Sequence, residues 1–362
     1  MGFLYRQILR KILFNFDPET VHDAVMKSVS ALQGVEPARM ILELLIRVKE
    51  MPVTVAGIRF RNPVGLAAGF DKNCEAPLIL AKLGFGFLEM GTITLRAQNG
   101  NPRPRVFRLS DHHGIINRMG FNNVGAYEAA RRLSKLGPAG VPLGLNIGKN
   151  ADCSLEDAPK NYLEALKVLY PFGDYFVFNI SSPNTLQLRV LHQKERLARL
   201  LEPALDFINS QRVKKPLFIK ISPELEDGDL SGLVATAAER GLGLIVTNTS
   251  VRRDHLHARW HSYEGGLSGK PLRDISNEML KKVSELAAGR VPLIGVGGVF
   301  DGPSAAEKFK LGANLVQVYS GLIYEGPFMV KDILRHLEKN QADLKRRARG
   351  LGPCLMAHSE KA

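Results

Sequence analysis

The sequence is poor in cysteine and tryptophan and has no long apolar run. Its three cysteines, Cys74, Cys153 and Cys354, are far apart and match no disulfide or metal-ligand spacing, which fits a reducing compartment. No apolar stretch approaches the roughly 20 residues that span a bilayer. The first residues also lack an apolar core followed by a small-residue cleavage site, so we expect no signal peptide. These absences argue against a disulfide scaffold, a metal centre built on cysteine and a membrane-spanning chain.

Acidic residues are in the minority as well. The chain has 36 acidic against 49 basic residues and a formal net charge of +13, so we expect anionic partners such as phosphates, carboxylates or a membrane surface. The main basic run, residues 345–349, lies in a C-terminal tail that we place at 341–362. It has no interleaved aromatic residues, so we predict a solvated tail and no nucleic-acid partner.

The first 50 residues have the pattern of a small helical domain. Residues 1–16 place apolar pairs at helical spacing with three positive charges and no acid, which is typical of a helix lying in a membrane interface. An amphipathic helix packed on its own domain is the alternative. Asp17 and Pro18 are typical of a helix start, and that helix should run to about Gln33. A third helix should follow Pro37, and a hairpin is expected at 53–60.

From residue 64 onward short apolar runs alternate with helical stretches such as 161–170 and 304–311. Eight runs recur over about 280 residues, which predicts a (β/α)₈ TIM barrel over residues 51–340. A doubly wound open sheet is the alternative, but no G-x-G-x-x-G follows the first run. We interpret residues 95–140 as a loop insertion. The eight runs are 64–67, 86–90, 143–146, 175–179, 217–220, 244–247, 293–296 and 315–319.

Nearly every one of these runs ends in a hydrogen-bonding side chain or a bare glycine backbone. Because the carboxyl ends of barrel strands share one rim, such a ring fits a flat ligand with several heteroatoms. The glycines at 295–298 and the turn at 319–321 match the phosphate site after strands 7 and 8, although a GxGG alone is also a common tight turn. The run ending in FNISSPNT, 178–185, is the richest, and as an isolated motif it reads as a capped Asn/Ser turn.

Taken together and in order, eight motifs resemble the dihydroorotate dehydrogenase family over nearly the whole chain. The helical N-terminus and a serine at position 182, where class 1 enzymes use cysteine, make the chain similar to class 2, the quinone-dependent branch. The motifs are AAGFDKN (67–73), NPRPRVFRL (101–109), INRMGFNN (116–123), FNISSPNT (178–185), VTNT (246–249), GGLSGKPL (265–272), IGVGGV (294–299) and VQVYSGLIYEGP (316–327).

The resemblance implies a flavoprotein of pyrimidine biosynthesis that oxidises dihydroorotate to orotate through FMN and passes the electrons to a membrane quinone. The positions matching the family's FMN contacts are Ala68, Gly69, Lys72, Thr92, Asn146, Asn179, Lys220, Thr247, Gly269, Gly298, Tyr319 and Ser320. Those matching its substrate contacts are Lys72, Asn117, Arg118, Met119, Gly120, Phe121, Asn179, Asn184, Asn248 and Thr249. His22 and Arg108 match the polar lining of its quinone tunnel, although either could be a structural residue.

Ser182 matches the family's catalytic base. A serine hydroxyl needs a dry pocket and a route for the proton, and Thr185 and Phe121 could line a water relay. The alternative role for Ser182 is a turn-capping hydroxyl.

The resemblance further implies that residues 1–50 associate with a membrane and form the quinone tunnel. We therefore expect a peripheral protein on the cytoplasmic face of a bacterial inner membrane. Three other readings remain. The first is a soluble dihydroorotate dehydrogenase linked to fumarate or NAD. The second is a related flavin barrel acting on another pyrimidine or on a uridine in RNA. The third is a basic membrane-surface binding protein without flavin.

Overall fold

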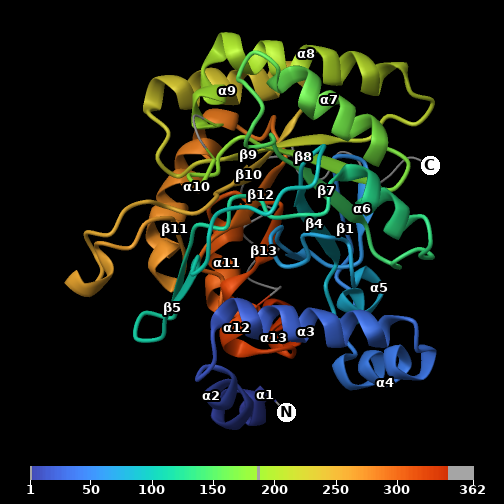
Figure 1. Ribbon diagram of the computed structural model, residues 1–362, viewed down its shortest axis with the longest axis vertical. Coiled ribbons are helices and arrows are strands. Elements are labelled where there is room, and N and C mark those ends of the chain that lie inside the picture. Colours follow the sequence, from blue (N-terminus) through green and yellow to red (C-terminus); the bar gives the residue numbers. More distant parts are fainter. Residues whose placement is uncertain (1, 186–187, 341–362) are drawn as a thin grey trace.

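The computed structural model describes residues 2–185 and 188–340, so the expected basic tail at 341–362 lies outside the described residues. Its centre is a closed barrel of parallel strands (Figure 1). The predicted (β/α)₈ barrel is confirmed, and each predicted apolar run contributes a strand. Around the ring the strands are β3 (Val64–Leu66), β4 (Phe87–Ile93), β7 (Leu143–Ile147), β8 (Tyr175–Asn179), β9 (Leu217–Ile221), β10 (Gly243–Val246), β12 (Leu293–Val296) and β13 (Leu315–Val318).

Helices follow the strands and cover the outside of the barrel, so that each strand is buried on both faces. The helices expected at 161–170 and 304–311 are present and begin slightly earlier. The outer helices are α5 (Pro77–Leu80), α6 (Ala126–Leu133), α7 (Ala158–Leu169), α8 (Lys194–Ser210), α9 (Asp227–Arg240), α10 (Arg273–Ala287), α11 (Gly302–Lys310), α12 (Ser320–Glu325) and α13 (Met329–Lys339).

The segment 95–140 is not the plain loop that its Arg, Pro and Asn content suggested. It contains a hairpin, β5 (Val106–Leu109) and β6 (Gly114–Asn117), followed by the barrel helix α6. Strand β11 (Gly266–Gly269) pairs antiparallel with β6, from Gly266 opposite Asn117 to Gly269 opposite Gly114. This three-stranded sheet stands outside the barrel and brings residues 114–121 to its mouth (Figure 1).

The amino end of the barrel is filled by aromatic rings lying on glycines. Phe87, Tyr175 and Phe218 each face a glycine on the neighbouring strand, namely Gly65, Gly144 and Gly243. A Cβ atom at these glycines would lie 2.3, 2.1 and 2.1 Å from the rings, so no larger residue fits without moving the ring. The expected hairpin, β1 (Val53–Val55) and β2 (Ile58–Phe60), closes this end, because Phe60 packs edge-on against Phe87 with centroids 5.1 Å apart.

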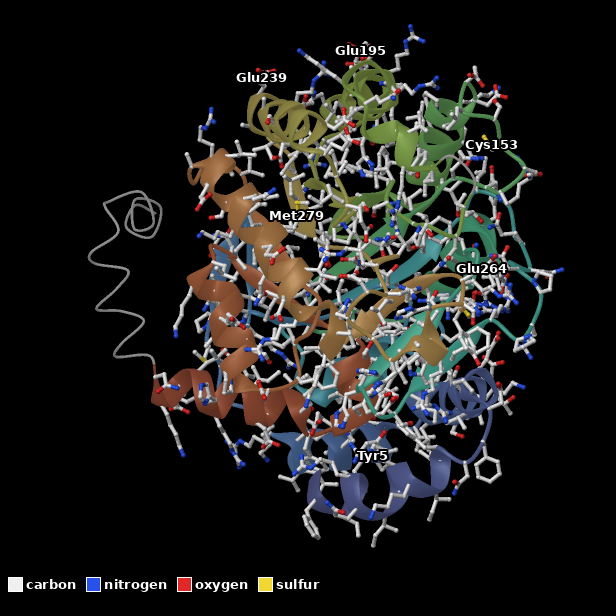
Figure 2. The ribbon with its side chains drawn as sticks, turned by 90° about the vertical axis from the view of Figure 1, so that its left-hand side faces the viewer. Tyr5, Cys153, Glu195, Glu239, Glu264 and Met279 are labelled. Atoms are coloured by element: carbon white, nitrogen blue, oxygen red, sulfur yellow. The ribbon has the colours of Figure 1, made fainter. Side chains whose placement is uncertain are left out.

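The N-terminal helices lie against α12 and α13 (Figure 1). A helical segment runs through α1 (Gly2–Leu4), a π-helical turn at Tyr5–Leu9 and α2 (Arg10–Leu13). It is joined to α12 by a 2.7 Å hydrogen bond from the Tyr5 hydroxyl to the Ile323 carbonyl, and Figure 2 shows Tyr5 at this junction. The predicted helices from Pro18 and Pro37 are α3 (Pro18–Gln33) and α4 (Glu36–Ile46). Within the described ranges no helix is both long enough and apolar enough to cross a bilayer.

A buried ion pair joins α3 to the segment before β5. Glu19 accepts hydrogen bonds from Nε and Nη2 of Arg105, the latter at 2.7 Å, and the two side chains are 5% and 7% exposed. Arg103 adds a second contact to the same carboxylate at 2.9 Å. Burial raises the pKa of Glu19, but the two guanidinium groups outweigh it and hold the pKa below its usual value. Glu19 is therefore a paired anion at neutral pH.

The glycine–aromatic floor gives the first prediction. Gly144→Ala places a methyl group 2.1 Å from the Tyr175 ring, and the overpacking should lower the free energy of unfolding by about 1–3 kcal/mol. Gly232→Ala is the matched control, because this glycine lies inside α9 with no atom within 4 Å of the added Cβ. That substitution should stabilise the protein by about 0.5–1 kcal/mol. Urea denaturation followed by circular dichroism would measure the free energy of unfolding of both variants. Equal stability of the two would contradict the tight packing of the Tyr175 ring on Gly144.

Candidate active site

A pocket opens at the carboxyl ends of the barrel strands, where the sequence placed the chemistry. Every predicted cofactor residue except Asn146 lines it, from Ala68 after β3 to Ser320 after β13. All of the predicted substrate residues except Arg118 line it as well. These residues come from most of the barrel strands, so closure of the ring is what brings them together.

Asn146 does not reach the pocket. It is fully buried in β7, where its Nδ2 donates to Glu89 Oε1 at 2.7 Å and its Oδ1 accepts from the Thr92 hydroxyl at 2.6 Å. Asn179 Nδ2 donates to the same hydroxyl at 3.1 Å. Asn146 therefore holds Thr92 from behind the pocket wall, and its contact with the cofactor stays a prediction.

The Arg118 side chain also lies away from the pocket. Its Nη2 donates to the Pro104 carbonyl at 3.2 Å, and its Nη1 lies 3.6 Å from Glu264. Its neighbours Asn117, Met119, Gly120 and Phe121 do line the pocket and form one side of it. Arg118 thus contributes only its backbone to this side of the pocket, and its backbone N–H donates to the Arg105 carbonyl at 2.8 Å.

Ser182 lies in the pocket, on the turn that follows β8, and is only 5% exposed. Its Oγ accepts the backbone N–H of Asn184 at 3.2 Å, so the turn-capping role is present in the structure. Asn184 Nδ2 in turn donates to the Asn117 carbonyl at 3.1 Å. Of the two residues suggested for a relay, Phe121 lines the pocket and Thr185 is 7% exposed next to the turn.

The amides of Asn179 and Asn248 line the pocket beside the turn that carries Ser182. Asn248 Nδ2 donates to Asn179 Oδ1 at 3.2 Å and to the Ser181 hydroxyl at 3.0 Å, and Asn248 Oδ1 accepts the Thr249 N–H at 2.9 Å. Amide groups carry both donors and acceptors. They suit a ligand that offers carbonyls and N–H groups in one plane.

Two lysines bring positive charge to the pocket. Lys220 rises from β9, 5% exposed, with its Nζ 3.7 Å from the buried carboxylate of Glu89. Lys72 follows β3, and its burial is the main cause that lowers the pKa of its ammonium group below the usual value. The pocket therefore attracts electron-rich groups from opposite sides of the barrel.

Another part of the pocket wall is formed by the glycine backbone that follows β12. Gly297 and Gly298 follow β12 with φ angles of 114° and 72°, and a Cβ on Gly298 would lie 2.5 Å from the Arg273 Cα. Ser268 and Ser320 join their hydroxyls at 2.8 Å beside them. Glycine is needed here because the positive φ and the approach of α10 leave no room for a side chain.

A second cavity, of about 420 Å³, lies under α3 and α4. It is lined mostly by apolar side chains of the N-terminal helices and α5, among them Leu13, Val29 and Leu42. Both predicted tunnel residues are in its wall. Arg108 donates to the Phe14 carbonyl at 2.9 Å and lies 4.6 Å above the Phe14 ring. Burial, with the charge of Lys72, lowers the pKa of His22 to about 3, so its imidazole is neutral at pH 7.

The two cavities have part of their walls in common. Lys72, Asn117, Met119 and Tyr319 line both of them. Burial raises the pKa of Tyr319 to about 12, so its hydroxyl stays protonated. These four residues therefore lie between the polar pocket and the apolar cavity.

Several pocket residues were not singled out from the sequence. Ser268 and Gln317 contribute polar atoms, while Leu272 and Phe300 contribute apolar surface. Gln317 lies inside strand β13, where the pattern indicates only a buried position, and Ser268 comes from β11, which is outside the barrel. The pairing of β11 with β6 brings Ser268 to the pocket, and this pairing cannot be recognised in the sequence.

Comparison with known proteins gives one consistent family. Residues 50–340 match the family model described as dihydroorotate dehydrogenase. The "Dihydroorotate dehydrogenase (quinone)" of Synechococcus sp. is 41% identical over 350 residues, covering 92% of each chain. That of Marinomonas sp. is 44% identical over 334 residues, covering 90% of this chain and 95% of its own.

A solved structure agrees with these relatives. The dihydroorotate dehydrogenase of Eimeria tenella in complex with ferulenol superimposes with a TM-score of 0.81 at 34% identity, over 91% of this chain and 95% of its own. Sequence and structure therefore agree over about nine-tenths of the chain. The chain belongs to the dihydroorotate dehydrogenase family.

Proposed function

We propose that this protein oxidises dihydroorotate to orotate and passes the electrons to a quinone, as the names of its relatives describe for them. The observation that carries the proposal is the pair of cavities with a shared wall. One cavity is polar and ringed by amides, and the other is apolar and roofed by the N-terminal helices. A polar donor and an apolar acceptor can then approach one redox group from two sides.

The redox group is FMN in this proposal, and the pocket residues fit it. The backbone at Gly297–Gly298 and the paired hydroxyls of Ser268 and Ser320 suit a phosphate. Gln317 Oε1 is buried without a hydrogen-bond partner and is available to a ligand N–H. Lys220 would hold positive charge at the ring edge that becomes electron-rich on reduction. When bound, the flavin supplies the hydride acceptor.

The chain's own residues would bind the substrate and take its proton. Asn117, Asn184, Asn248 and Thr249 would read the carbonyls, N–H groups and carboxylate of the dihydropyrimidine. Ser182, which is 5% exposed, would accept the C5 proton at its Oγ while its own hydroxyl proton passes to a water relay beside Thr185 and Phe121. For this the Oγ must exchange its present bond from the Asn184 N–H for one to the substrate.

The N-terminal helices would meet a membrane, where a quinone is dissolved. Their outward faces carry large apolar side chains that residues 2–185 and 188–340 leave exposed, alongside the cations Arg6 and Lys11. This supports peripheral attachment, which we place at the cytoplasmic face of a bacterial inner membrane, with residues 1–50 as the attaching unit and 51–340 as the catalytic barrel. The most exposed are Phe3, Leu4, Ile8, Ile12, Met40, Ile41 and Leu44, at 53–72%.

Ser182→Ala tests the base. Removing the proton acceptor should slow flavin reduction by dihydroorotate about 10²–10⁴-fold, because that is the usual contribution of a positioned general base. Flavin content should stay unchanged, since among the described residues the Ser182 side chain makes one hydrogen bond, from the Asn184 N–H. Anaerobic stopped-flow absorbance would measure the rate, and flavin absorbance after gel filtration would measure the content.

Ser182→Cys is the matched control for this experiment. A thiol keeps a titratable proton acceptor at the same position and should restore part of the rate, with a pH profile shifted toward the thiol pKa. If Ser182→Ala keeps most of its rate, Ser182 is a turn-capping residue only.

Val29→Trp tests the path of the acceptor. Val29 lines the apolar cavity from α3 and does not line the polar pocket, so the indole should fill part of the cavity. We expect the KM for a ubiquinone analogue to rise at least tenfold while flavin reduction by dihydroorotate is unchanged. Val213→Trp, at a residue 64% exposed, is the control. A point variant is preferable to deleting residues 1–50, because deletion leaves buried Arg105 without Glu19.

A further inference from the structure

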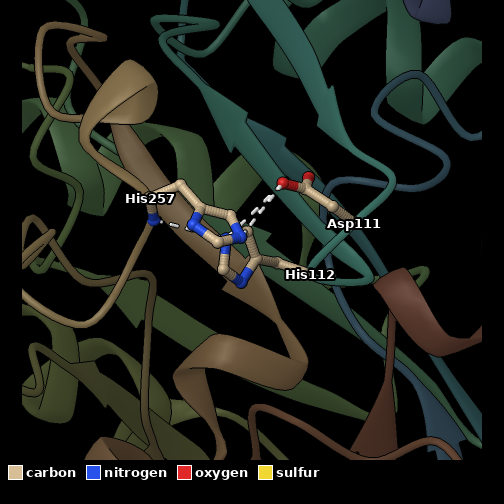
Figure 3. Close-up of side chains that lie close together, drawn as sticks. All are labelled: Asp111, His112 and His257. Carbon is tan, nitrogen blue, oxygen red and sulfur yellow. Dashed lines mark hydrogen bonds and ion pairs between the residues drawn. The ribbon is translucent and has the colours of Figure 1, made fainter.

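A cluster of two imidazoles and a carboxylate lies outside the pocket and has no part in the proposed reaction (Figure 3). Asp111 and His112 are on the turn between β5 and β6, and His257 is on the loop between Ser250 and β11. Asp111 Oδ2 is 3.6 Å from His112 Nε2 and 3.9 Å from His257 Nε2. Among the described residues this is the single group of three whose ligand atoms all lie within 4.8 Å of one another.

The turn that carries Asp111 and His112 is held rigidly. The Tyr324 hydroxyl donates to the carbonyls at both ends of the turn, Leu109 at 3.3 Å and Gly114 at 2.8 Å. His113 stacks on the Tyr324 ring with centroids 5.0 Å apart and planes 9° apart. The His112 N–H closes the turn on the Leu109 carbonyl at 3.0 Å. Two of the three ligands are thus pre-positioned by packing.

The loop that carries His257 is anchored next to it. Leu256 is 7% exposed and packs with Leu109, Ile116 and Leu267 in a small apolar cluster to which Trp260 also belongs. The His257 side chain itself is 69% exposed, so it can rotate without disturbing that cluster. Its ring already lies beside that of His112, with centroids 4.7 Å apart.

We propose that Asp111, His112 and His257 form a binding site for a borderline divalent transition metal such as Zn²⁺. Imidazole nitrogens with one carboxylate suit Zn²⁺, Ni²⁺ and Cu²⁺, whereas Mg²⁺ and Ca²⁺ prefer oxygen alone. Tetrahedral ligands about 2.1 Å from a metal are about 3.4 Å apart. The 3.6 and 3.9 Å distances therefore need only small side-chain movements. Water would complete the coordination, because the site is at the surface.

The metal must displace existing partners of two ligands, and one of these partners is the His257 backbone N–H, which donates to His112 Nε2 at 3.4 Å. Arg259 Nη2 lies 2.5 Å from Asp111 Oδ2, and Trp260 Nε1 lies 3.5 Å from the same oxygen. Partial burial raises the pKa of Asp111, but these two bonds outweigh it and keep the pKa below its usual value, so the group is an anion. The Arg259 side chain is 64% exposed and can move into solvent. Arg259 and the metal therefore compete for one carboxylate.

Binding would tie the loop 251–265 to the β5–β6 turn. This loop begins two residues after the pocket residue Thr249 and ends three residues before the pocket residue Ser268. The two segments are already joined, because the His257 N–H donates to His112 Nε2 at 3.4 Å and Arg259 bonds Asp111. A metal would add a further link between residues 145 positions apart in the sequence. The site would thus control how far one wall of the pocket can open.

Titration of the full-length, flavin-loaded protein with ZnCl₂ and NiCl₂ tests the site. Isothermal calorimetry should give one site per chain in the wild type, at least tenfold weaker in His257→Ala and in His112→Ala. His255→Ala is the matched control, because His255 lies on the same loop outside the cluster, and its affinity should equal the wild type. Arg259→Ala should bind about tenfold more tightly, because a competing cation has been removed.

A second readout follows the loop itself. Saturating Zn²⁺ should slow tryptic cleavage at Arg252 and Arg253 in the wild type and leave the rate unchanged in His257→Ala. Equal metal affinity in wild type, His112→Ala and His257→Ala would overturn the site. Unchanged affinity in Arg259→Ala would show that Asp111 is not a ligand and would also overturn it.

A different observation, inside the barrel, carries a second inference, which rests on the proposed function. Glu89 on β4 is fully buried beneath the pocket. It is bound by Asn146 Nδ2 at 2.7 Å and Gln317 Nε2 at 2.5 Å, and lies 3.7 Å from Lys220 Nζ, whose ion partner among the described residues it is. We propose that Glu89 is a positioning residue that holds Lys220 in place and sets the midpoint potential of the bound flavin by partly cancelling the lysine charge.

Glu89→Gln removes the charge and keeps the shape. In the wild type, Gln317 Oε1 has no hydrogen-bond partner among the described residues. The Gln317 amide can therefore rotate so that its oxygen accepts from the NH₂ group that the substitution introduces. The uncancelled Lys220 should favour the reduced flavin at least tenfold, a positive shift of about 30 mV for a two-electron couple. Spectroelectrochemistry measures it, and Glu89→Asp, which keeps the charge, should stay near the wild type.

The outcomes separate the two claims. Flavin bound with an unchanged potential in Glu89→Gln would overturn the role of Glu89 and leave the proposed function standing. A wild-type protein that binds no flavin would instead overturn the proposed function. If Glu89→Gln fails to fold, a wild-type potential in Glu89→Asp together with a positive shift in Gln317→Leu, which loosens the carboxylate, would support the role. No shift in Gln317→Leu would contradict it.

Discussion

The structure depends on filling the inside of a closed parallel barrel. Eight strands leave an interior that side chains must occupy, and here the amino end is filled by three aromatic rings lying against three glycines. With that end plugged, the upper half of the interior is free for polar groups. Glu89, Lys220 and Gln317 occupy it, each satisfied from within the barrel or pointed at the pocket. The apolar floor thus makes a buried charged layer possible directly beneath the candidate active site.

The N-terminal helices add what the barrel cannot provide for itself. The rim is polar because strand ends and loops are polar, so a barrel of this kind has no large apolar chamber of its own. Helices α3 and α4 supply one, latched by the buried pair of Glu19 and Arg105. The neutral imidazole of His22 and the guanidinium of Arg108 are among its polar groups, with Glu19, Lys72 and Asn117. The polar pocket and the apolar cavity thus adjoin at Lys72, Asn117, Met119 and Tyr319, which line both.

Much of this could be predicted from the sequence, because strand periodicity and polar strand ends are local signals. Those signals placed Ser182, Asn179 and Lys220 on one rim before any geometry was known. What failed was non-local. Asn146 and Gln317 both lie on barrel strands, and which of them reaches the pocket depends on neighbouring side chains. Ser268 and the Asp111–His257 cluster depend on the pairing of segments about 150 residues apart, which no periodicity encodes.

The three-stranded sheet of β5, β6 and β11 has a consequence for how the family can vary. Its strands are inserted after β4 and after β10, and they pair with one another without joining the barrel ladder. Insertions and deletions in the β5–β6 turn or in the loop 251–265 therefore leave the barrel register unchanged. The same segments reach the pocket through Asn117 and Ser268. Changes in the length of these segments can therefore alter substrate access to the pocket while the packing of the barrel core stays the same.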